Sequence, residues 1–291
     1  MNKFILNIIL FFSPILIFVV VILGFFTFGS DKLEAVFKVD DRIENIIIGD
    51  SHSTLAMNDS LIKNTKSFAN YSESYIFNYY KLKIIHKLNP NVKNVLLSVG
   101  CHNFAKYYDK FTLNSDLLGR YFVLFPFKDQ VWLLNHSNNK ISLLKYAVYY
   151  GAMDYLVNDS MSYQGGYNNI VLEKVVDSNS IEKRINRQYG DLDLNDFKSD
   201  MNIKYFHKII EYCKKNNLNL ILFKTPLYSG YNNKIPDVIK DEYAKITKGM
   251  TILQYDSLFE SDKRYFMPDG DHLKIIGANK FSKLVDDYLN N

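Results

Sequence analysis

Short, mostly apolar runs recur along the chain and predict the strands of a parallel sheet. They cover residues 45–51, 66–70, 92–99, 218–223 and 250–255. Segments with apolar residues at helical spacing lie between and after these runs, and they predict helices at 72–88, 200–217, 237–248 and 275–288. This alternation favours an α/β fold in which a parallel sheet of about five strands lies between two layers of helices.

The alternation is interrupted between residues 113 and 198. Helical apolar runs at 117–125, 130–134 and 141–156 are followed by a loop-like stretch around Gln164–Tyr167. Excursions of this length between two sheet strands are uncommon and are usually functional. We interpret 113–198 as a cap or substrate-facing insertion; the alternative is that it only thickens one helical layer.

The amino-terminal region predicts a membrane anchor. Residues 4–28 form an uncharged run of about 25 residues, which is long enough to cross the hydrocarbon core of a bilayer. A secretory signal peptide would have a shorter apolar region and a small-residue cleavage site. We therefore expect a transmembrane signal anchor at 1–29, a stalk at 30–43 and a domain at 44–291. Lys3 favours a cytoplasmic amino terminus and an extracytoplasmic domain.

Charge and cysteine content exclude some partners and sites. The 291 residues carry 35 basic and 31 acidic side chains, a net charge of +4, which is too balanced to indicate nucleic-acid binding. Cys101 and Cys213 are the two cysteines, and no Cys/His spacing matches a zinc site. We expect no metal and no cofactor. A Cys101–Cys213 disulfide is possible, but two buried thiols are favoured because free cysteines are commonly buried.

The first apolar run stops abruptly on Gly49-Asp50-Ser51, and a helical segment follows. Ser51 is therefore expected in a strand-to-helix turn, where its hydroxyl is presented at the sheet edge. Backbone N–H groups and the helix dipole favour negative charge at such a turn. A serine nucleophile and the oxyanion that it forms need this environment.

A serine nucleophile needs a base, and the base needs an orienting partner. Of the six histidines, His272 stands out because it lies in a Pro/Gly/Asp loop with Asp269 three residues earlier. The Asp-x-x-His spacing can bring the carboxylate onto the imidazole. Glu73 and Asp271 are interpreted as helix-start residues.

Three further residues lie close in sequence to the predicted strand ends. His52 follows Ser51, and Gly100 and His102 follow the third strand. We consider all three as possible substrate-site residues; for His52 and His102, local hydrogen bonding is an equally good interpretation.

The Gly49-Asp50-Ser51 turn and the Asp269-x-x-His272 block resemble the first and last blocks of the SGNH (GDSL-type) hydrolase superfamily. The resemblance covers residues 44–112 and 200–291. It implies a flavodoxin-like three-layer α/β/α fold, with Ser51 as nucleophile, His272 as base and Asp269 as the residue that orients the base.

The middle blocks of that superfamily supply oxyanion donors. Gly100-Cys101-His102-Asn103 resembles the third block with its asparagine one residue late, so Asn103 is the candidate amide donor. The glycine of the second block has no counterpart. The backbone N–H of Ser72, expected at a helix start, and that of Ser51 are the other candidates.

A membrane anchor on such a domain resembles the accessory proteins of teichoic acid D-alanylation and alginate O-acetylation. The resemblance implies a cell-surface polysaccharide as partner, the lipid bilayer through residues 4–28, and a polytopic membrane O-acyltransferase as a further candidate. Three functions stay open: an acyltransferase working through acyl-Ser51, a carbohydrate acyl esterase with the same triad, and a non-catalytic assembly or binding subunit.

Overall fold

The computed structural model describes residues 36–157, 165–190, 193 and 195–290, together with positions 3, 6, 7, 10–14 and 17. No helix within these described ranges is both long and apolar enough to span a bilayer. The membrane span expected at 4–28 lies largely outside the described residues.

Two compact units divide the chain. One, here called the helical unit, comprises Met1–Val36 and Leu113–Tyr163. The other, here called the sheet unit, comprises Phe37–Thr112 and Gln164–Asn291. The sheet unit contains every strand of the described chain and all the residues proposed from the sequence as site residues.

A five-stranded parallel sheet forms the centre of the sheet unit, as the alternation of strands and helices predicts. The strands are β1 (Asn45–Ile48), β2 (Thr65–Ser67), β3 (Asn94–Ser98), β4 (Asn219–Phe223) and β5 (Ile252–Leu253). Their order is β2-β1-β3-β4-β5, the order of flavodoxin-like doubly wound sheets. In such sheets ligands bind beyond the carboxyl ends of the strands, near the point where the strand order reverses. Ser51 follows β1, which occupies this region.

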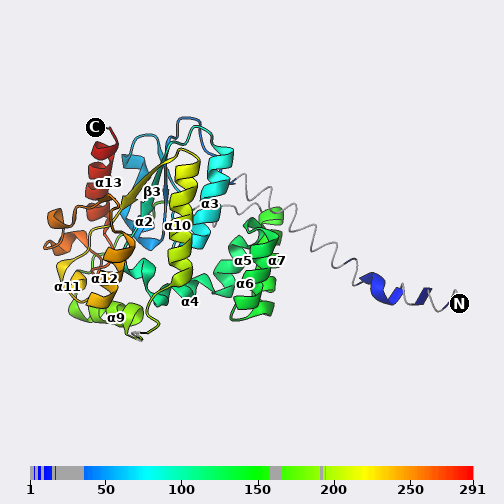
Figure 1. Ribbon diagram of the computed structural model, residues 1–291. Coiled ribbons are helices and arrows are strands. Elements are labelled where there is room, and N and C mark those ends of the chain that lie inside the picture. Colours follow the sequence, from blue (N-terminus) through cyan, green and yellow to red (C-terminus); the bar gives the residue numbers. More distant parts are fainter. Residues whose placement is uncertain are drawn as a thin grey trace. The chain divides into compact units, whose positions relative to one another are not determined.

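Helices connect the strands and cover the sheet (Figure 1). The sheet unit contains α2 (Ser51–Ala56), α3 (Tyr75–Leu88), α4 (Asp109–Thr112), α9 (Ser178–Tyr189), α10 (Asp200–Lys215), α11 (Ser229–Asn232), α12 (Asp237–Ile246) and α13 (Ile275–Asn290). Helix α3 packs against α10, and α13 packs against α2. Both pairings are consistent with helical layers on the two faces of the sheet.

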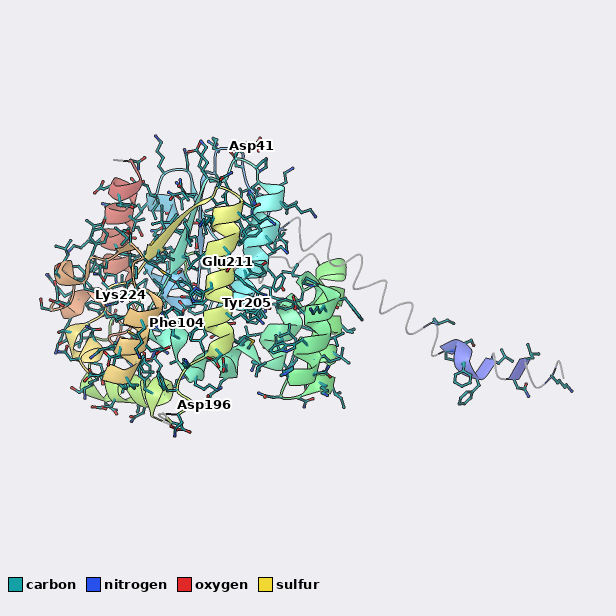
Figure 2. All side chains as sticks on the ribbon, viewed as in Figure 1. Asp41, Phe104, Asp196, Tyr205, Glu211 and Lys224 are labelled. Atoms are coloured by element: carbon teal, nitrogen blue, oxygen red, sulfur yellow. The ribbon has the colours of Figure 1, made fainter. Side chains whose placement is uncertain are left out.

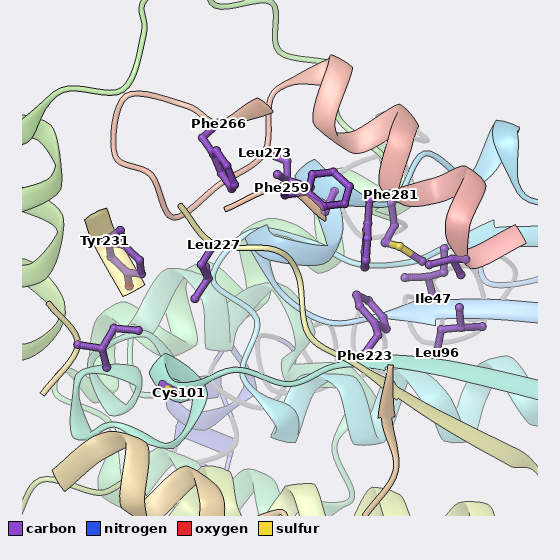
Figure 3. Close-up of a cluster of buried hydrophobic side chains, with 14 of the residues drawn as sticks. Ile47, Leu96, Cys101, Phe223, Leu227, Tyr231, Phe259, Phe266, Leu273 and Phe281 are labelled. Atoms are coloured by element: carbon purple, nitrogen blue, oxygen red, sulfur yellow. The ribbon is translucent and has the colours of Figure 1, made fainter. Parts of the chain in front are cut away.

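The core forms where the central strands meet α13 (Figure 3). Ile47 on β1 pairs in register with Leu96 on β3, and both side chains are fully buried. Phe223 at the end of β4 lies against Phe281 of α13, with ring centroids 6.1 Å apart. Burying side chains of this size stabilises the fold by about 1.5–3 kcal/mol each, so these contacts hold the carboxyl ends of the strands in place.

Several elements differ from the predicted boundaries. Residues from Phe37 onward belong to the sheet unit instead of forming a free stalk, because Phe37 is fully buried. Strand β2 ends at Ser67, before Phe68–Asn70. Helix α9 lies inside the expected insertion at 113–198, yet from Gln164 the chain belongs to the sheet unit. The reason is that α9 buries Ile181 and Tyr189 in the core of that unit.

The helical unit contains α5 (Ser115–Tyr121), α6 (Phe127–His136) and α7 (Lys140–Val157). Helices α5 and α7 pack closely at Gly119, where an added Cβ would overlap the side chain of Tyr146. The backbone of one helix therefore approaches the other without a side chain between them.

Candidate active site

The turn after β1 presents Ser51 at the sheet edge. Gly49 adopts φ 145°, and a Cβ there would overlap the hydroxyls of Ser53 and Ser98. Asp50 caps α2, because its Oδ1 accepts a hydrogen bond from the backbone N–H of His52 at 2.9 Å. Ser51 is thus the first residue of the helix, in the strand-to-helix turn that the sequence predicts.

Ser51, His272 and Asp269 form a hydrogen-bonded series. Ser51 Oγ lies 3.0 Å from His272 Nε2, and His272 Nδ1 lies 2.8 Å from Asp269 Oδ2. With the proton on Nδ1, the ring donates to Asp269 and its Nε2 accepts from the serine hydroxyl. The structure therefore brings together the three residues that the sequence singles out for nucleophilic chemistry.

The loop that carries His272 is shaped by Asp269. Its Oδ1 accepts hydrogen bonds from the backbone N–H groups of Asp271 at 3.1 Å and His272 at 3.3 Å. Gly270, between them, adopts φ 68°. Burial raises the pKa of the Asp269 carboxyl, but the charge and hydrogen bond of His272 outweigh burial and place it below its ordinary value. Asp269 is therefore an ionised acceptor at neutral pH.

A buried ion pair lies behind His272. His52 Nε2 donates to Asp271 Oδ1 at 2.9 Å, and His52 Nδ1 lies 3.4 Å from Asp50 Oδ1. Burial alone would lower the pKa of His52, but the charges of Asp271 and Asp50 raise it to about 10. The prediction that Asp271 starts a helix is wrong, because its carboxylate is buried against His52 and Arg184.

Three imidazole rings stack beside Ser51. The ring centroids of His52 and His102 are 3.9 Å apart, and those of His52 and His272 are 4.7 Å apart. His102 Nε2 donates to Asp50 Oδ2 at 2.8 Å. Burial and the positive charge of His52 lower the pKa of His102, so that ring is neutral at pH 7. Of the two rings interpreted as possible substrate contacts, His102 lines the cavity at Ser51, whereas His52 is enclosed by its carboxylate partners.

Asn103, the predicted amide donor to an oxyanion, does not line the cavity at Ser51, and both polar atoms of its amide have protein partners. Its Nδ2 donates to Asp50 Oδ2 at 3.0 Å, and its Oδ1 accepts from the backbone N–H of Gly100 at 2.8 Å. Asn103 therefore ties the end of β3 to the turn after β1. Gly100 takes part through this backbone bond and does not line the cavity at Ser51.

Ser72 lies at the cavity but not at a helix start. Helix α3 begins at Tyr75, and Ser72 adopts φ 60° in the preceding turn. Within the described chain its backbone N–H has no hydrogen-bond partner, which leaves it able to donate to a ligand. Glu73 does not cap the helix either. Its carboxylate forms a buried ion pair with Lys81 at 2.9 Å that fixes this turn.

A cavity of about 180 Å³ opens beside Ser51. Its lining comprises Ser51, Leu55, Tyr71, Ser72, His102, Tyr107, Tyr108, Phe111, Arg184, Arg187, Gln188 and His272. The sequence did not identify Arg184, Arg187 and Gln188, which lie on α9. The spacing of Ile181, Ile185 and Gln188 would have indicated a helix with one inward face.

Among the described residues, two groups of side chains could approach a metal ion: Asp50, His52 and His102, and His52, Asp271 and His272. Both are internally hydrogen-bonded. Asp50 Oδ2 already accepts from His102, Asn103 and the hydroxyl of Tyr108. Asp271 Oδ2 accepts from Arg184 Nε at 2.6 Å, and this guanidinium would repel a cation. We therefore assign these side chains to a hydrogen-bonding network.

Cys101 and Cys213 are free and buried, which confirms the favoured interpretation of two thiols. Burial raises the pKa of Cys101 to about 11 and that of Cys213 to about 12.

Comparisons with known proteins do not identify a family. No family model matches the chain, and no curated protein matches it. Among solved structures, the chain is similar to one described as "a putative platelet activating factor" from Streptococcus pneumonia. That likeness has 14% sequence identity and a TM-score of 0.43, over 95% of this chain and 98% of that chain. A likeness of this size supports no assignment.

Proposed function

We propose that the protein is a serine acyl-transfer enzyme that forms an ester on Ser51. The observation that carries the proposal is the series Ser51 Oγ, His272 and Asp269, with distances of 3.0 Å and 2.8 Å. Ser51 and His272 line a cavity at the carboxyl end of the sheet, where a substrate can approach the hydroxyl.

In the first half of the reaction, Ser51 Oγ attacks the carbonyl carbon of an acyl donor. His272 Nε2 takes the hydroxyl proton and then delivers it to the leaving oxygen, so the donor bond breaks and acyl-Ser51 remains. Asp269 holds the Nδ1–H of the ring and stabilises the imidazolium that forms during the attack.

The negative charge that develops on the carbonyl oxygen needs N–H donors. The backbone N–H of Ser51 at the start of α2 and that of Ser72 are the groups available in the cavity. The φ of 60° at Ser72 supports this role, because residues other than glycine that adopt strained backbone conformations are concentrated at functional sites.

In the second half, a hydroxyl group attacks the acyl carbon of acyl-Ser51 while His272 Nε2 accepts its proton. His272 then delivers this proton to Ser51 Oγ, so the bond between Oγ and the acyl group breaks and the serine is restored. The proposed acceptor is a hydroxyl of a cell-surface polysaccharide, on the strength of the sequence resemblance. If water attacks instead, the same residues perform ester hydrolysis.

A neutral fluorophosphonate tests the nucleophile. We expect it to label the full-length wild-type protein at Ser51 and to leave Ser51→Ala unlabelled, with Ser60→Ala as a control because Ser60 is an exposed serine. Absence of labelling in a folded wild-type protein would contradict the proposal.

The direction of transfer needs a second measurement. Mass analysis of surface polysaccharide from cells that carry Ser51→Ala should show lost acylation if the enzyme is a transferase. Excess acylation would instead indicate an esterase.

A further inference from the structure

The cavity beside Ser51 has a cationic lining. Arg184 and Arg187 both contribute to it, and none of the described residues that line it is acidic. The two arginines are three positions apart on α9, so they lie on one face of that helix. A guanidinium binds carboxylate and phosphate through paired N–H donors.

Arg184 is fixed in a defined orientation. Its side chain is 14% exposed, and its Nε donates to Asp271 Oδ2 at 2.6 Å. Its Nη2 lies 3.4 Å from His272 Nε2, the atom that faces the serine hydroxyl. Asp271 balances the charge of Arg184, whose Nη2 donor lies beside His272 Nε2 at the cavity.

Within the described chain, the guanidinium of Arg187 is not part of an ion pair. It is exposed, it has no carboxylate partner among the described residues, and its guanidinium lies 5.9 Å from the ring centroid of Phe111. The nearby Lys106 differs from Arg187 because its ammonium group has a carboxylate partner. Lys106, in the adjacent hollow, is bound by Asp196 at 3.0 Å (Asp196 is labelled in Figure 2). Arg187 lines that hollow as well, but Asp193 and Asp196 also line it, whereas no carboxylate is among the described residues that line the cavity at Ser51. An anion is therefore better accommodated on the Ser51 side of Arg187.

One part of the remaining lining is aromatic or aliphatic. Tyr107, Tyr108, Phe111 and Leu55 offer an apolar surface on which the uncharged part of a substrate can pack. The cavity thus combines a nucleophile, an apolar wall and a cationic wall on α9.

We propose that the substrate of Ser51 carries an anionic group, a phosphate or a carboxylate, which Arg187 and the free donors of Arg184 bind within this cavity. The inference rests on the proposed function in that it names the substrate class of the same site. Arg187 supplies the attraction and Arg184 the orientation, because Arg184 is paired with Asp271 whereas Arg187 has no ion-pair partner among the described residues.

Calorimetry tests binding without catalysis. Inorganic phosphate and succinate are titrated separately, at constant ionic strength, into full-length Ser51→Ala. We expect at least one of them to bind, and Arg187→Gln in the same background to weaken that binding about ten- to hundredfold, the usual effect of losing a hydrogen bond to a charged group. The two titrations distinguish a phosphate ligand from a carboxylate ligand.

Two further variants sharpen the result. Arg187→Lys keeps the charge and should retain part of the affinity, whereas Arg264→Gln, an exposed arginine paired with Asp262, should leave it unchanged. Binding that is equally tight in Arg187→Gln, or no binding of either anion up to about 10 mM, would overturn the inference.

Protection of the wild-type serine locates the anion. The anion that binds should slow fluorophosphonate labelling of Ser51, and binding without protection would place it elsewhere and overturn the inference. If the wild-type protein is not labelled at all, the proposed function fails, and the calorimetric comparison of Arg187→Gln with its parent decides the anion site on its own.

Discussion

His52 Nε2 and Asp271 Oδ1 are 2.9 Å apart, and both side chains are buried behind the imidazole of His272. Each is the sequence neighbour of a residue in the proposed triad, since His52 follows Ser51 and Asp271 precedes His272. The pair therefore connects the turn that carries the serine to the loop that carries the base.

Replacing His52 should change how stability depends on pH. The pKa of His52 in the folded protein is about 10, above the 6.5 of an ordinary histidine. Its contribution to the free energy of unfolding is therefore complete below about pH 6.5 and is lost as the pH rises through about 10. We expect His52→Gln to lower the free energy of unfolding at pH 6 by about 3 kcal/mol, because Asp271 and Asp50 lose a charged partner.

Urea unfolding at several pH values between 6 and 10 measures this effect. The gap between wild type and His52→Gln should narrow as the pH rises. His207→Gln is the matched control, because His207 is exposed on α10. A gap that stays constant across the range would argue against a charged His52.

Asp269→Asn should slow the chemistry far more than it destabilises the fold. An asparagine can donate to His272 Nδ1, and this favours the tautomer with the proton on Nε2, which cannot accept from Ser51. We expect the rate of fluorophosphonate labelling to fall by about three to four orders of magnitude. Asp237→Asn, at an exposed aspartate, is the control. A rate within tenfold of wild type would count against the role of Asp269.

Asn103→Ala distinguishes two roles for that amide. Because Asn103 bonds to Asp50 and Gly100, its loss should lower the free energy of unfolding by about 1–3 kcal/mol. The labelling rate should then change only a few-fold. The opposite result, unchanged stability with a rate about two to three orders of magnitude lower, is what an oxyanion donor would give.

The two thiols should resist alkylation in the folded protein. Burial raises the pKa of Cys101 to about 11 and that of Cys213 to about 12, so neither is a thiolate at pH 8. We expect mass spectrometry to find no iodoacetamide adduct on native protein and two adducts after unfolding. Rapid modification of the native protein would show that a thiol is accessible.

The parts of the fold that follow local rules could be predicted from the sequence. A β-branched run that ends on Gly49 specifies both β1 and the turn at Ser51. The carboxylate of Asp269 reaches His272 within one turn, so that contact is also local. The link between Ser51 and His272 is long-range, and it was anticipated from the need of a serine nucleophile for a base and from the resemblance to a known pattern.

The rest of the site depends on tertiary packing. Asn103 and Asp271 have ordinary sequence contexts, and their partners lie on other elements of the sheet unit. Phe104, labelled in Figure 2, follows Asn103 in the chain. Its ring centroid lies 5.3 Å from that of Phe206 on α10. Packing of this kind fixes which way the short turn after β3 points, and local propensity does not encode it. The sequence did not identify Arg184 for the same reason. Packing of α9 against the core of the sheet unit places this side chain at the site.

The distance along the chain between Ser51 and His272 has a consequence for synthesis of the protein. The turn that carries the serine is made early, whereas the proposed base and its aspartate precede the last helix, α13. A chain interrupted before Asp269 would carry a serine hydroxyl without its proposed proton acceptor. Labelling of Ser51 would therefore show that translation has passed the loop that carries His272. A shorter chain would not react with the fluorophosphonate.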